Sequence, residues 1–235
     1  MITQIIARLP PKILTILRFI RNRYLPDYSS KTFSQEGEDV ILRRIFESKE
    51  KGFYVDVGAH HPFRYSNTYI FYKKGWTGIN LDAMPGSMKL FEKYRSKDIN
   101  LEIPVGNTEN ILTYNIFNDK ALNGFSNDIS NKREFDSKYF IESKIEMQVS
   151  KLSLILDKYL PKNKEIDFLT IDVEGLDFEV LKSNDWTKYK PKCVLVEILE
   201  SSLHDIYKNR IATFLRSHGY EIYAKTVYTV IFMRQ

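Results

Sequence analysis

The segment that most limits how this chain can fold is an apolar run that ends at a glycine, Phe53-Tyr54-Val55-Asp56-Val57-Gly58. A run of β-branched and aromatic residues of this kind is typical of a parallel strand that is covered on both faces. In open α/β sheets, ligands bind just outside the carboxyl ends of such strands. Gly58 allows a sharp backbone turn there, and Asp56 can hold a charged or hydroxyl-bearing group. We therefore expect a ligand pocket directly after Val57.

A second strand-like run, Thr77-Gly78-Ile79-Asn80-Leu81, ends at a carboxylate, Asp82. In dinucleotide-binding folds, an acid at the end of the second strand receives the ribose hydroxyls of the ligand, and Asp82 fits that role. The first loop reads Gly58-Ala59-His60-His61 and lacks the glycine spacing that holds a pyrophosphate, which disfavours NAD and FAD. A ribose-binding acid without a pyrophosphate loop suits an adenosyl ligand without phosphates, and S-adenosylmethionine is the commonest of these.

Strand-like and helix-like segments alternate along most of the chain. Because strands that alternate with helices form right-handed βαβ units, we predict an α/β fold with a mostly parallel sheet. Two β-rich runs, 220–224 and 227–232, are separated by two residues and so must form an antiparallel hairpin. Residues 108–150 break the alternation, and we interpret them as an irregular insertion near the pocket, with a strand pattern at 112–117. The other predicted strands are 53–57, 77–81, 100–105, 166–171 and 192–198, and the predicted helices are 37–47, 67–74, 86–95, 152–159 and 176–182.

The positive charge of the chain is concentrated at its N-terminus. The formal net charge is +5, and residues 1–26 contain five Lys or Arg residues and no acid. After Pro10-Pro11, apolar residues recur with helical spacing, so we expect a basic amphipathic helical segment at 1–30, followed by one domain at 31–235. Such a helix can lie on an anionic membrane surface or dock on a partner. The alternative is that it packs on its own domain.

Composition also bears on the partners and the compartment. The charges after residue 26 cancel, which disfavours a nucleic-acid-binding face. Cys193 is the single cysteine, so no disulfide can form within the chain. The sequence lacks the roughly 18 consecutive apolar residues of a spanning helix, and its first segment does not resemble a signal peptide. We expect a cytoplasmic protein, with residues 1–25 as a candidate contact to the inner membrane face; the sequence does not indicate an oligomeric state.

Acidic residues also follow two later strands. Asp172 and Glu174 come at the end of the run 166–171, and Glu197 follows the apolar run 193–196. Because the carboxyl ends of parallel strands lie at the same edge of a sheet, these acids can converge on the predicted pocket. For Glu174, the alternative is a role at the start of the next helix, where an acid favours the positive end of the helix dipole.

Four motifs occur together in one order over roughly residues 33–200. They are Phe33-Ser34-Gln35-Glu36-Gly37-Glu38-Asp39, residues 52–62 followed by Ser66-Asn67-Thr68, Gly75-Trp76-Thr77-Gly78-Ile79-Asn80-Leu81-Asp82, and residues 166–175. In this combination the chain resembles the FkbM family of S-adenosylmethionine-dependent methyltransferases. The resemblance implies a Rossmann-like class I methyltransferase fold, with a mostly parallel seven-stranded sheet that ends in an antiparallel hairpin. One departure is Thr170, where the family often has a lysine.

The resemblance also implies S-adenosylmethionine as the cofactor and suggests which residues contact it. An anion such as the methionine carboxylate is favoured near the start of a helix, where N–H groups are exposed. For the acidic run after Ser34, the alternative is a structural cluster at a helix N-terminus. The implied contacts are Asp56, Gly58 and Ala59 in the first loop, Asp82 at the ribose, Ser66 and Asn67 at the methionine carboxylate, Val105, Gly106 and Asn107 at the adenine, and Gln35 and Glu36 over the methionine end.

Methyl transfer to a hydroxyl requires an aligned acceptor and a group that removes the proton. His60 and His61 lie in the loop beside the expected methyl position, and we favour His61 slightly as the general base. The alternative is that Asp172 and Glu197 hold a divalent cation such as Mg²⁺, which would acidify the hydroxyl. A third option is that both histidines only shape the loop.

We predict an S-adenosylmethionine-dependent O-methyltransferase that acts on a hydroxyl of a sugar or another small molecule. Sequences of this type often accompany polysaccharide or natural-product synthesis, which favours a surface glycan or its nucleotide-linked precursor. Aromatic residues of the insertion, among them Tyr114 and Phe125, are candidates for an acceptor wall. Two alternatives are a catalytically silent subunit that docks on a membrane-associated assembly and a metal-dependent hydrolase built on Asp172, Glu174 and Glu197.

Overall fold

The computed structural model describes residues 10–24, 30–118, 124–125 and 138–235. The chain divides into two compact units, Met1–Lys31 and Thr32–Gln235. In the first unit, helix α2 (Pro11–Tyr24) begins directly after Pro10 and buries none of its residues. Among the described residues, no helix is long and apolar enough to cross a membrane.

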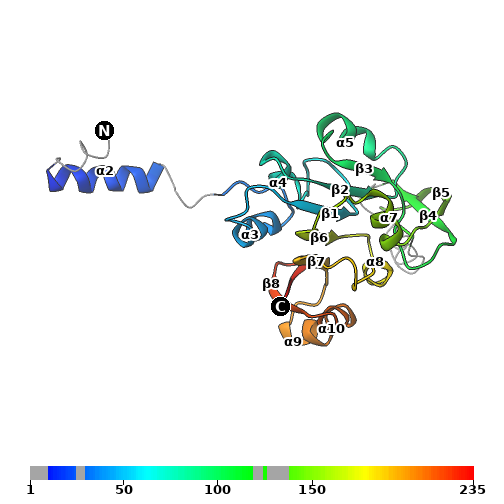
Figure 1. Ribbon diagram of the computed structural model, residues 1–235. Helices are drawn as coiled ribbons and strands as arrows, with labels where there is room; N and C mark the ends of the chain where they lie inside the picture. Colours follow the sequence, from blue (N-terminus) through cyan, green and yellow to red (C-terminus); the bar gives the residue numbers. More distant parts are fainter. Residues whose placement is uncertain (1–9, 25–29, 119–123, 126–137) are drawn as a thin grey trace. The chain divides into compact units, whose positions relative to one another are not determined.

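The second unit is built on a seven-stranded sheet with the order β3-β2-β1-β6-β7-β9-β8 (Figure 1). Strands β3, β2, β1, β6 and β7 run parallel to one another, whereas β9 is antiparallel to both β7 and β8. The predicted class I methyltransferase fold, with its terminal antiparallel hairpin, is thereby confirmed. The strands are β1 (Phe53–Val57), β2 (Thr77–Asp82), β3 (Ile99–Glu102), β6 (Phe168–Ile171), β7 (Cys193–Glu197), β8 (Tyr220–Lys225) and β9 (Thr229–Arg234).

Helices follow most of the strands, as the alternating pattern predicts. Helices α9 and α10 lie in a stretch to which the sequence analysis assigned no element. Helix α7 has the predicted bounds, whereas α4 is shorter than predicted. The helices of this unit are α3 (Glu38–Ile45), α4 (Tyr69–Lys73), α5 (Met88–Tyr94), α7 (Leu152–Tyr159), α8 (Asp177–Ser183), α9 (Leu203–Lys208) and α10 (Arg210–Ser217).

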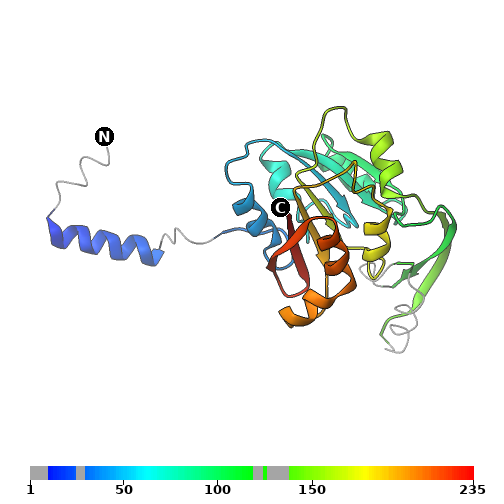
Figure 2. The same ribbon diagram turned by 60° about the horizontal axis from the view of Figure 1, so that its bottom comes forward.

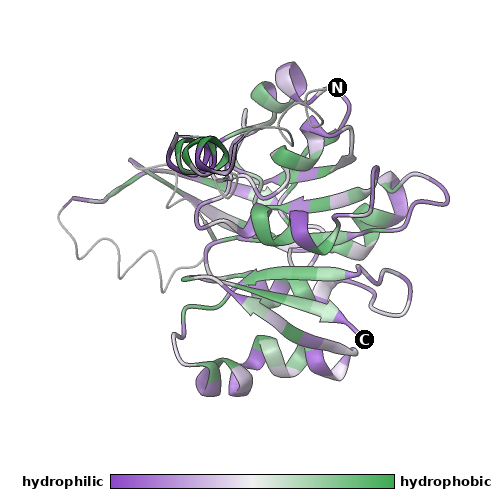
Figure 3. Cartoon of the chain, turned by 90° about the vertical axis from the view of Figure 1, so that its left-hand side faces the viewer, coloured by the Kyte–Doolittle hydropathy of each residue, from purple (hydrophilic) through white to green (hydrophobic). Residues whose placement is uncertain are grey.

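The sheet carries a hydrophobic core on each face, because successive side chains of a strand point to opposite sides. On β1, Val55 and Val57 belong to a cluster that includes buried residues of α7, α8 and α10. Tyr54, which precedes Val55 and so points to the opposite face, belongs to a second cluster with residues of α3 and α4. Figure 3 shows the apolar colouring along the strands between these helices. Cover on both faces explains why the strand sequences are almost continuously apolar.

The segment that was predicted to be an irregular insertion contains a second sheet. Strands β4 (Ile111–Phe117) and β5 (Ile141–Gln148) pair antiparallel, with an irregularity between Ile116 and Phe117. Figure 2 shows this two-stranded sheet beside the main one. The prediction of irregular structure after residue 117 was wrong for β5, because β5 exposes five of its eight residues and has no strong apolar pattern.

Candidate cofactor and catalytic site

A cavity of about 370 Å³ opens at the carboxyl ends of β1, β2 and β6. Its volume falls in the range of small-molecule sites. Nine residues that the sequence singled out lie in its wall, namely Gln35, Gly58, His60, Asp82, Val105, Tyr114, Phe125, Asp172 and Glu174. The other lining residues are Val57, Tyr65, Leu81, Ala83, Met84, Ile103, Gly124, Val173 and Leu176.

Asp82, the last residue of β2, is fixed in the cavity wall by two backbone N–H groups. Its Oδ2 accepts a hydrogen bond from the N–H of His60 at 3.0 Å, and its Oδ1 accepts one from the N–H of Met84 at 2.7 Å. Burial raises the pKa of this carboxyl. Because each carboxylate oxygen can accept more than one hydrogen bond, Asp82 retains acceptor capacity for two ribose hydroxyls. Its geometry suits the predicted ribose contact.

Gly58 allows β1 and β6 to approach closely at the floor of the cavity. Its φ is +88°, and a Cβ at this position would lie 1.7 Å from the carbonyl oxygen of Asp172. The N–H groups of Gly58 and Ala59 both donate to the carbonyl of Leu81, at 2.8 and 3.0 Å. A side chain at position 58 would therefore push apart the strand ends that form the site.

The two adjacent histidines differ in position. His60 is exposed, lines the cavity and has a left-handed backbone with φ 49°. The Nδ1 atom of His61 accepts hydrogen bonds from the N–H groups of Phe63 and Arg64, both at 3.2 Å. Burial, followed by the charge of His60, lowers the pKa of His61. His61 is thus engaged in shaping its loop, whereas His60 lines the cavity, so this arrangement favours His60 over His61 as a proton acceptor.

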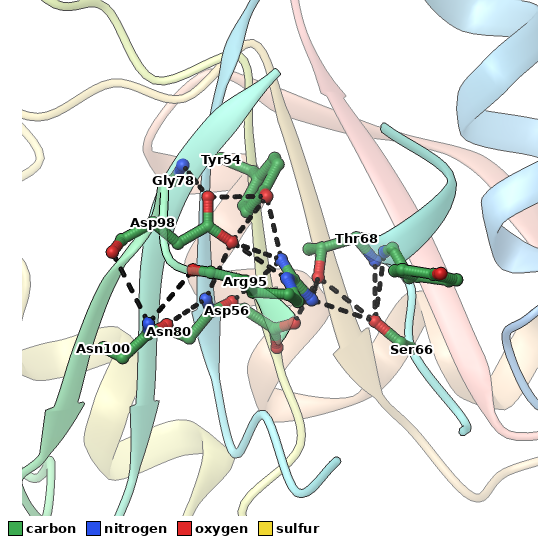
Figure 4. Close-up of polar contacts among 10 residues, drawn as sticks. Tyr54, Asp56, Ser66, Thr68, Gly78, Asn80, Arg95, Asp98 and Asn100 are labelled. Carbon is green, nitrogen blue, oxygen red and sulfur yellow. Dashed lines mark hydrogen bonds and ion pairs between the residues drawn. The ribbon is translucent and has the colours of Figure 1, made fainter. Parts of the chain in front are cut away.

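Asp56 lies behind the cavity wall, in a buried polar network (Figure 4). Its Oδ2 accepts a hydrogen bond from the hydroxyl of Thr68 at 2.8 Å. Burial raises the pKa of Asp56 to about 6, although the charge of Arg95 acts in the opposite direction. Ser66, also assigned to the cofactor, accepts a hydrogen bond from the N–H of Tyr69 at 3.1 Å and so satisfies the start of α4.

Arg95 occupies the centre of this network and is fully buried. Its guanidinium forms an ion pair with Asp98, with Nη2 and Oδ2 2.8 Å apart. It also donates to the hydroxyls of Tyr54 and Thr68, at 2.8 and 2.9 Å, and to Asn80 Oδ1 at 3.2 Å. Asp98 in turn accepts hydrogen bonds from Tyr54, Gly78 and Asn80. The network joins β1, β2 and the end of α5 behind the cavity.

Five other residues assigned to the cofactor, Glu36, Ala59, Asn67, Gly106 and Asn107, lie outside the lining of the cavity, and their roles stay predictions. Asn67 donates a hydrogen bond to Thr170 Oγ1 at 3.0 Å. Thr170, where the family often has a lysine, therefore holds the side chain of Asn67. Glu36 accepts a hydrogen bond from the N–H of Tyr228 at 2.9 Å. Ala59 packs with Met88 and Phe91, and Asn107 is half-buried two residues after Val105.

Three acids approach the cavity from β6 and β7. Asp172 is open to the cavity but recessed among protein atoms, and this position, together with the charge of Glu197, raises its pKa well above the usual range. Glu174 also lines the cavity, with a left-handed φ of 54°. Within the described ranges, no group of three or more His, Cys, Asp or Glu side chains could hold a metal ion. Asp172 and Glu197 therefore do not gain a third donor of these types.

Sequence reasoning missed several lining residues. Tyr65, Met84 and Leu176 follow strand ends in loops, where no periodic pattern marks them. Ile103 comes directly after β3 and lies inside the predicted strand 100–105. Its place at a strand end was the one sequence signal that could have identified it as a cavity residue. Tyr114, a candidate for the acceptor wall, lines the cavity, and its ring lies 4.8 Å from that of Phe125, centroid to centroid.

The parallel sheet, the cavity at its carboxyl edge and the fixed acid at the end of β2 define a Rossmann-like protein with a site for an adenosyl ligand. The sequence model of the methyltransferase FkbM domain matches residues 56–222. The chain therefore belongs to the FkbM methyltransferase family, which uses S-adenosylmethionine, and the predicted family is confirmed.

Comparison with solved structures returned methyltransferases with low identity, each at a TM-score of 0.43. A proposed type 11 methyltransferase from Sulfolobus solfataricus is 13% identical, and the match covers 86% of this chain and 94% of that one. A TehB-like methyltransferase from Corynebacterium glutamicum is 9% identical, with 94% and 97% covered. A proposed RNA methyltransferase from Pyrococcus horikoshii is 11% identical, with 96% and 99% covered. No curated protein matches the sequence.

Proposed function

We propose that this methyltransferase transfers the methyl group of S-adenosylmethionine to a hydroxyl oxygen of a sugar, in the synthesis of a surface glycan or its nucleotide-linked precursor in the cytoplasm. The observation that carries the proposal is the pairing, in one cavity, of His60 with an aromatic wall formed by Tyr114 and Phe125. A ring face of this kind can cover the apolar face of a sugar, while neighbouring polar groups bind its hydroxyls.

The cavity wall has two chemically different parts. Leu81, Ile103 and Val105 form an apolar part next to Asp82, which suits an adenosine. Tyr114, Phe125 and Glu174 belong to the other part, and a Cβ at Gly124 would lie 3.7 Å from the Cβ of Glu174. Backbone hydrogen bonds between Asn115 and Gly124, at 2.9 and 3.2 Å, hold this segment in place. An acceptor hydroxyl bound here would share the cavity with His60.

Bound S-adenosylmethionine supplies an activated methyl group on a sulfonium that is a good leaving group. His60 would accept the hydroxyl proton as the acceptor oxygen takes the methyl group, and the neutral thioether of the cofactor would be the leaving group. Asp82 orients the nucleoside, and the fixed wall reduces the entropy cost of alignment. Asp172 shares the cavity wall with His60, and its position and the charge of Glu197 raise the pKa of its carboxyl.

The test is methyl transfer from labelled S-adenosylmethionine to a panel of nucleotide sugars and methyl glycosides, with products located by NMR. We expect an O-methyl product. The His60→Ala variant should lose roughly 10²- to 10⁴-fold in kcat and keep its affinity for S-adenosylhomocysteine. His61→Asn is the matched control, because its amide oxygen can still accept from the loop N–H groups, and it should keep most activity. An N-methyl product, or a loss confined to His61→Asn, would contradict the proposal.

A further inference from the structure

Helix α2 exposes a continuous apolar stripe. At 3.6 residues per turn, five residues with spacings of three or four fall on one side of the helix. The exposed fraction of these residues ranges from 43% for Leu17 to 71% for Tyr24. An exposed apolar surface of this kind marks an interaction site. The stripe consists of Ile13, Ile16, Leu17, Ile20 and Tyr24.

Basic residues surround this stripe. By the same helical periodicity, Arg21 borders one edge, Lys12 and Arg23 border the other, and Arg18 lies on the opposite side with Asn22. No acid occurs in the helix. A narrow apolar stripe between flanking cations is the composition of a helix that lies in the plane of a membrane interface, with its cations among anionic headgroups.

Other ways of covering the stripe fit less well. The helix has 14 residues, so it is about 21 Å long and cannot cross a hydrocarbon core of about 30 Å. Pairing of the stripe with that of a second copy would bring Arg21 and Arg23 of two helices together, with no acid in either helix to balance them. An anionic lipid surface provides both an apolar environment for the stripe and negative charges for the surrounding cations.

We propose that α2 docks this protein on the surface of an anionic membrane, with the stripe at the boundary between headgroups and acyl chains. The chain continues from Tyr24 to Gln35, a residue of the cavity wall. These eleven steps span at most roughly 40 Å. Docking therefore limits how far Gln35 can lie from the docked helix to this length. On the proposed function, this favours an acceptor sugar that is linked to a lipid.

Flotation of the full chain with vesicles tests the docking directly. We expect binding to vesicles of phosphatidylglycerol and phosphatidylcholine, and at least tenfold weaker binding to phosphatidylcholine alone. Each Arg→Gln change at Arg18, Arg21 or Arg23 should weaken binding roughly fivefold. The pair Ile16→Ser and Ile20→Ser keeps the charge and should abolish binding. Equal binding to both vesicle types, or full binding by the serine pair, would overturn the proposal.

A fluorescent label resolves how the helix lies. Cys193 is buried, so a cysteine introduced on α2 can be labelled selectively. An environment-sensitive dye at Leu17→Cys should shift to the blue when anionic vesicles are added, whereas the dye at Asn22→Cys, on the polar side, should shift little. A blue-shifted dye at position 17 before any lipid is added would show that the stripe packs on protein, and it would refute docking through this face.

The lipid-linked acceptor has a separate readout. Methyl transfer to a soluble sugar should be the same for the Ile16→Ser, Ile20→Ser pair and the natural chain, because these positions lie outside the cavity. Transfer to a lipid-linked sugar in vesicles should fall at least tenfold in the pair. Equal loss with both acceptors would contradict a membrane role, and absence of O-methylation in the natural chain would instead refute the proposed function while leaving docking intact.

Discussion

Two carboxylates at neighbouring strand ends, Asp56 on β1 and Asp82 on β2, show how position within a strand decides the role of an acid. In the register of the sheet, Asp56 lies opposite Asn80, two residues before Asp82. Asp56 and Asp82 therefore point to the same face but are offset by about 7 Å along the strand direction. Asp56 lies beneath helices α4 and α5 and is bound by Thr68, whereas Asp82 reaches the open edge and the cavity.

This difference separates a structural region from a ligand-binding region. The buried network around Arg95 joins three elements and is satisfied from within the protein. Asp82 is held by two backbone N–H groups but still faces the cavity. We infer that changes in the network alter the stability of the fold, and that changes at Asp82 alter ligand binding. Three measurements test this separation.

The largest effect is expected from Arg95→Met, which removes the only cation that is paired within the network described here. Loss of one partner leaves Asp98 buried without its counter-charge, and breaking such a pair typically costs about 3–5 kcal/mol. Urea unfolding should report a loss of this size. Lys97→Met, at an exposed position two residues away, is the control and should stay within about 0.5 kcal/mol. A loss below about 1 kcal/mol for Arg95→Met would show that the network is not a structural centre.

The next effect concerns pH. Because the pKa of Asp56 is raised to about 6 in the fold, the folded state binds more protons than the unfolded state between about pH 4 and 6, and the free energy of unfolding falls as pH rises through this window. The shift of roughly two pKa units corresponds to about 3 kcal/mol. Asp56→Asn keeps an acceptor for Thr68 and should remove this part of the decline.

Asp177 provides the internal control for that experiment. Burial also raises its pKa to about 6, so a second decline over the same window should persist in Asp56→Asn. The expected result is therefore a shallower pH profile of unfolding, not a flat one. Parallel pH profiles for the natural chain and Asp56→Asn would mean that burial does not raise the pKa of Asp56 in the folded state.

Much of the fold followed from the sequence because buried parallel strands have a distinctive composition. Strand β1 and helix α7 have their predicted bounds, and the C-terminal hairpin follows from the two residues that separate its strands. Strand β5 could not be recognised, since its pairing with β4 depends on a partner more than twenty residues away and not on its own pattern. The cavity residues Gly58 and Asp82 were predicted because a strand end marks them in the sequence.

The division between the network and the cavity was not predictable in the same way. Arg95 follows an amphipathic segment and would ordinarily be exposed, because charged side chains are rarely buried unless they are paired. Its partners, Tyr54, Asn80 and Asp98, come from separate elements that only the folded sheet brings together. The sequence motif contains Asp56 and Gly58 together, and alternation along β1 alone does not reveal that α4 and α5 cover the acid.

The smallest effect, and the sharpest test of the separation, is the comparison of Asp82→Asn with Asp56→Asn in calorimetric binding of S-adenosylmethionine. Hydrogen bonds to a charged group contribute about 1.5–3 kcal/mol, so Asp82→Asn should weaken binding roughly 10- to 100-fold, whereas Asp56→Asn should stay within about threefold. The natural chain should also lose affinity as pH falls through the raised pKa of Asp82, since only the ionised carboxylate accepts from both ribose hydroxyls while its backbone contacts persist. The Asp82→Asn variant should lack that pH dependence. If both variants bind equally well, Asp82 does not hold the cofactor; if Asp56→Asn loses as much affinity as Asp82→Asn, the network and the cavity form one functional unit instead of two.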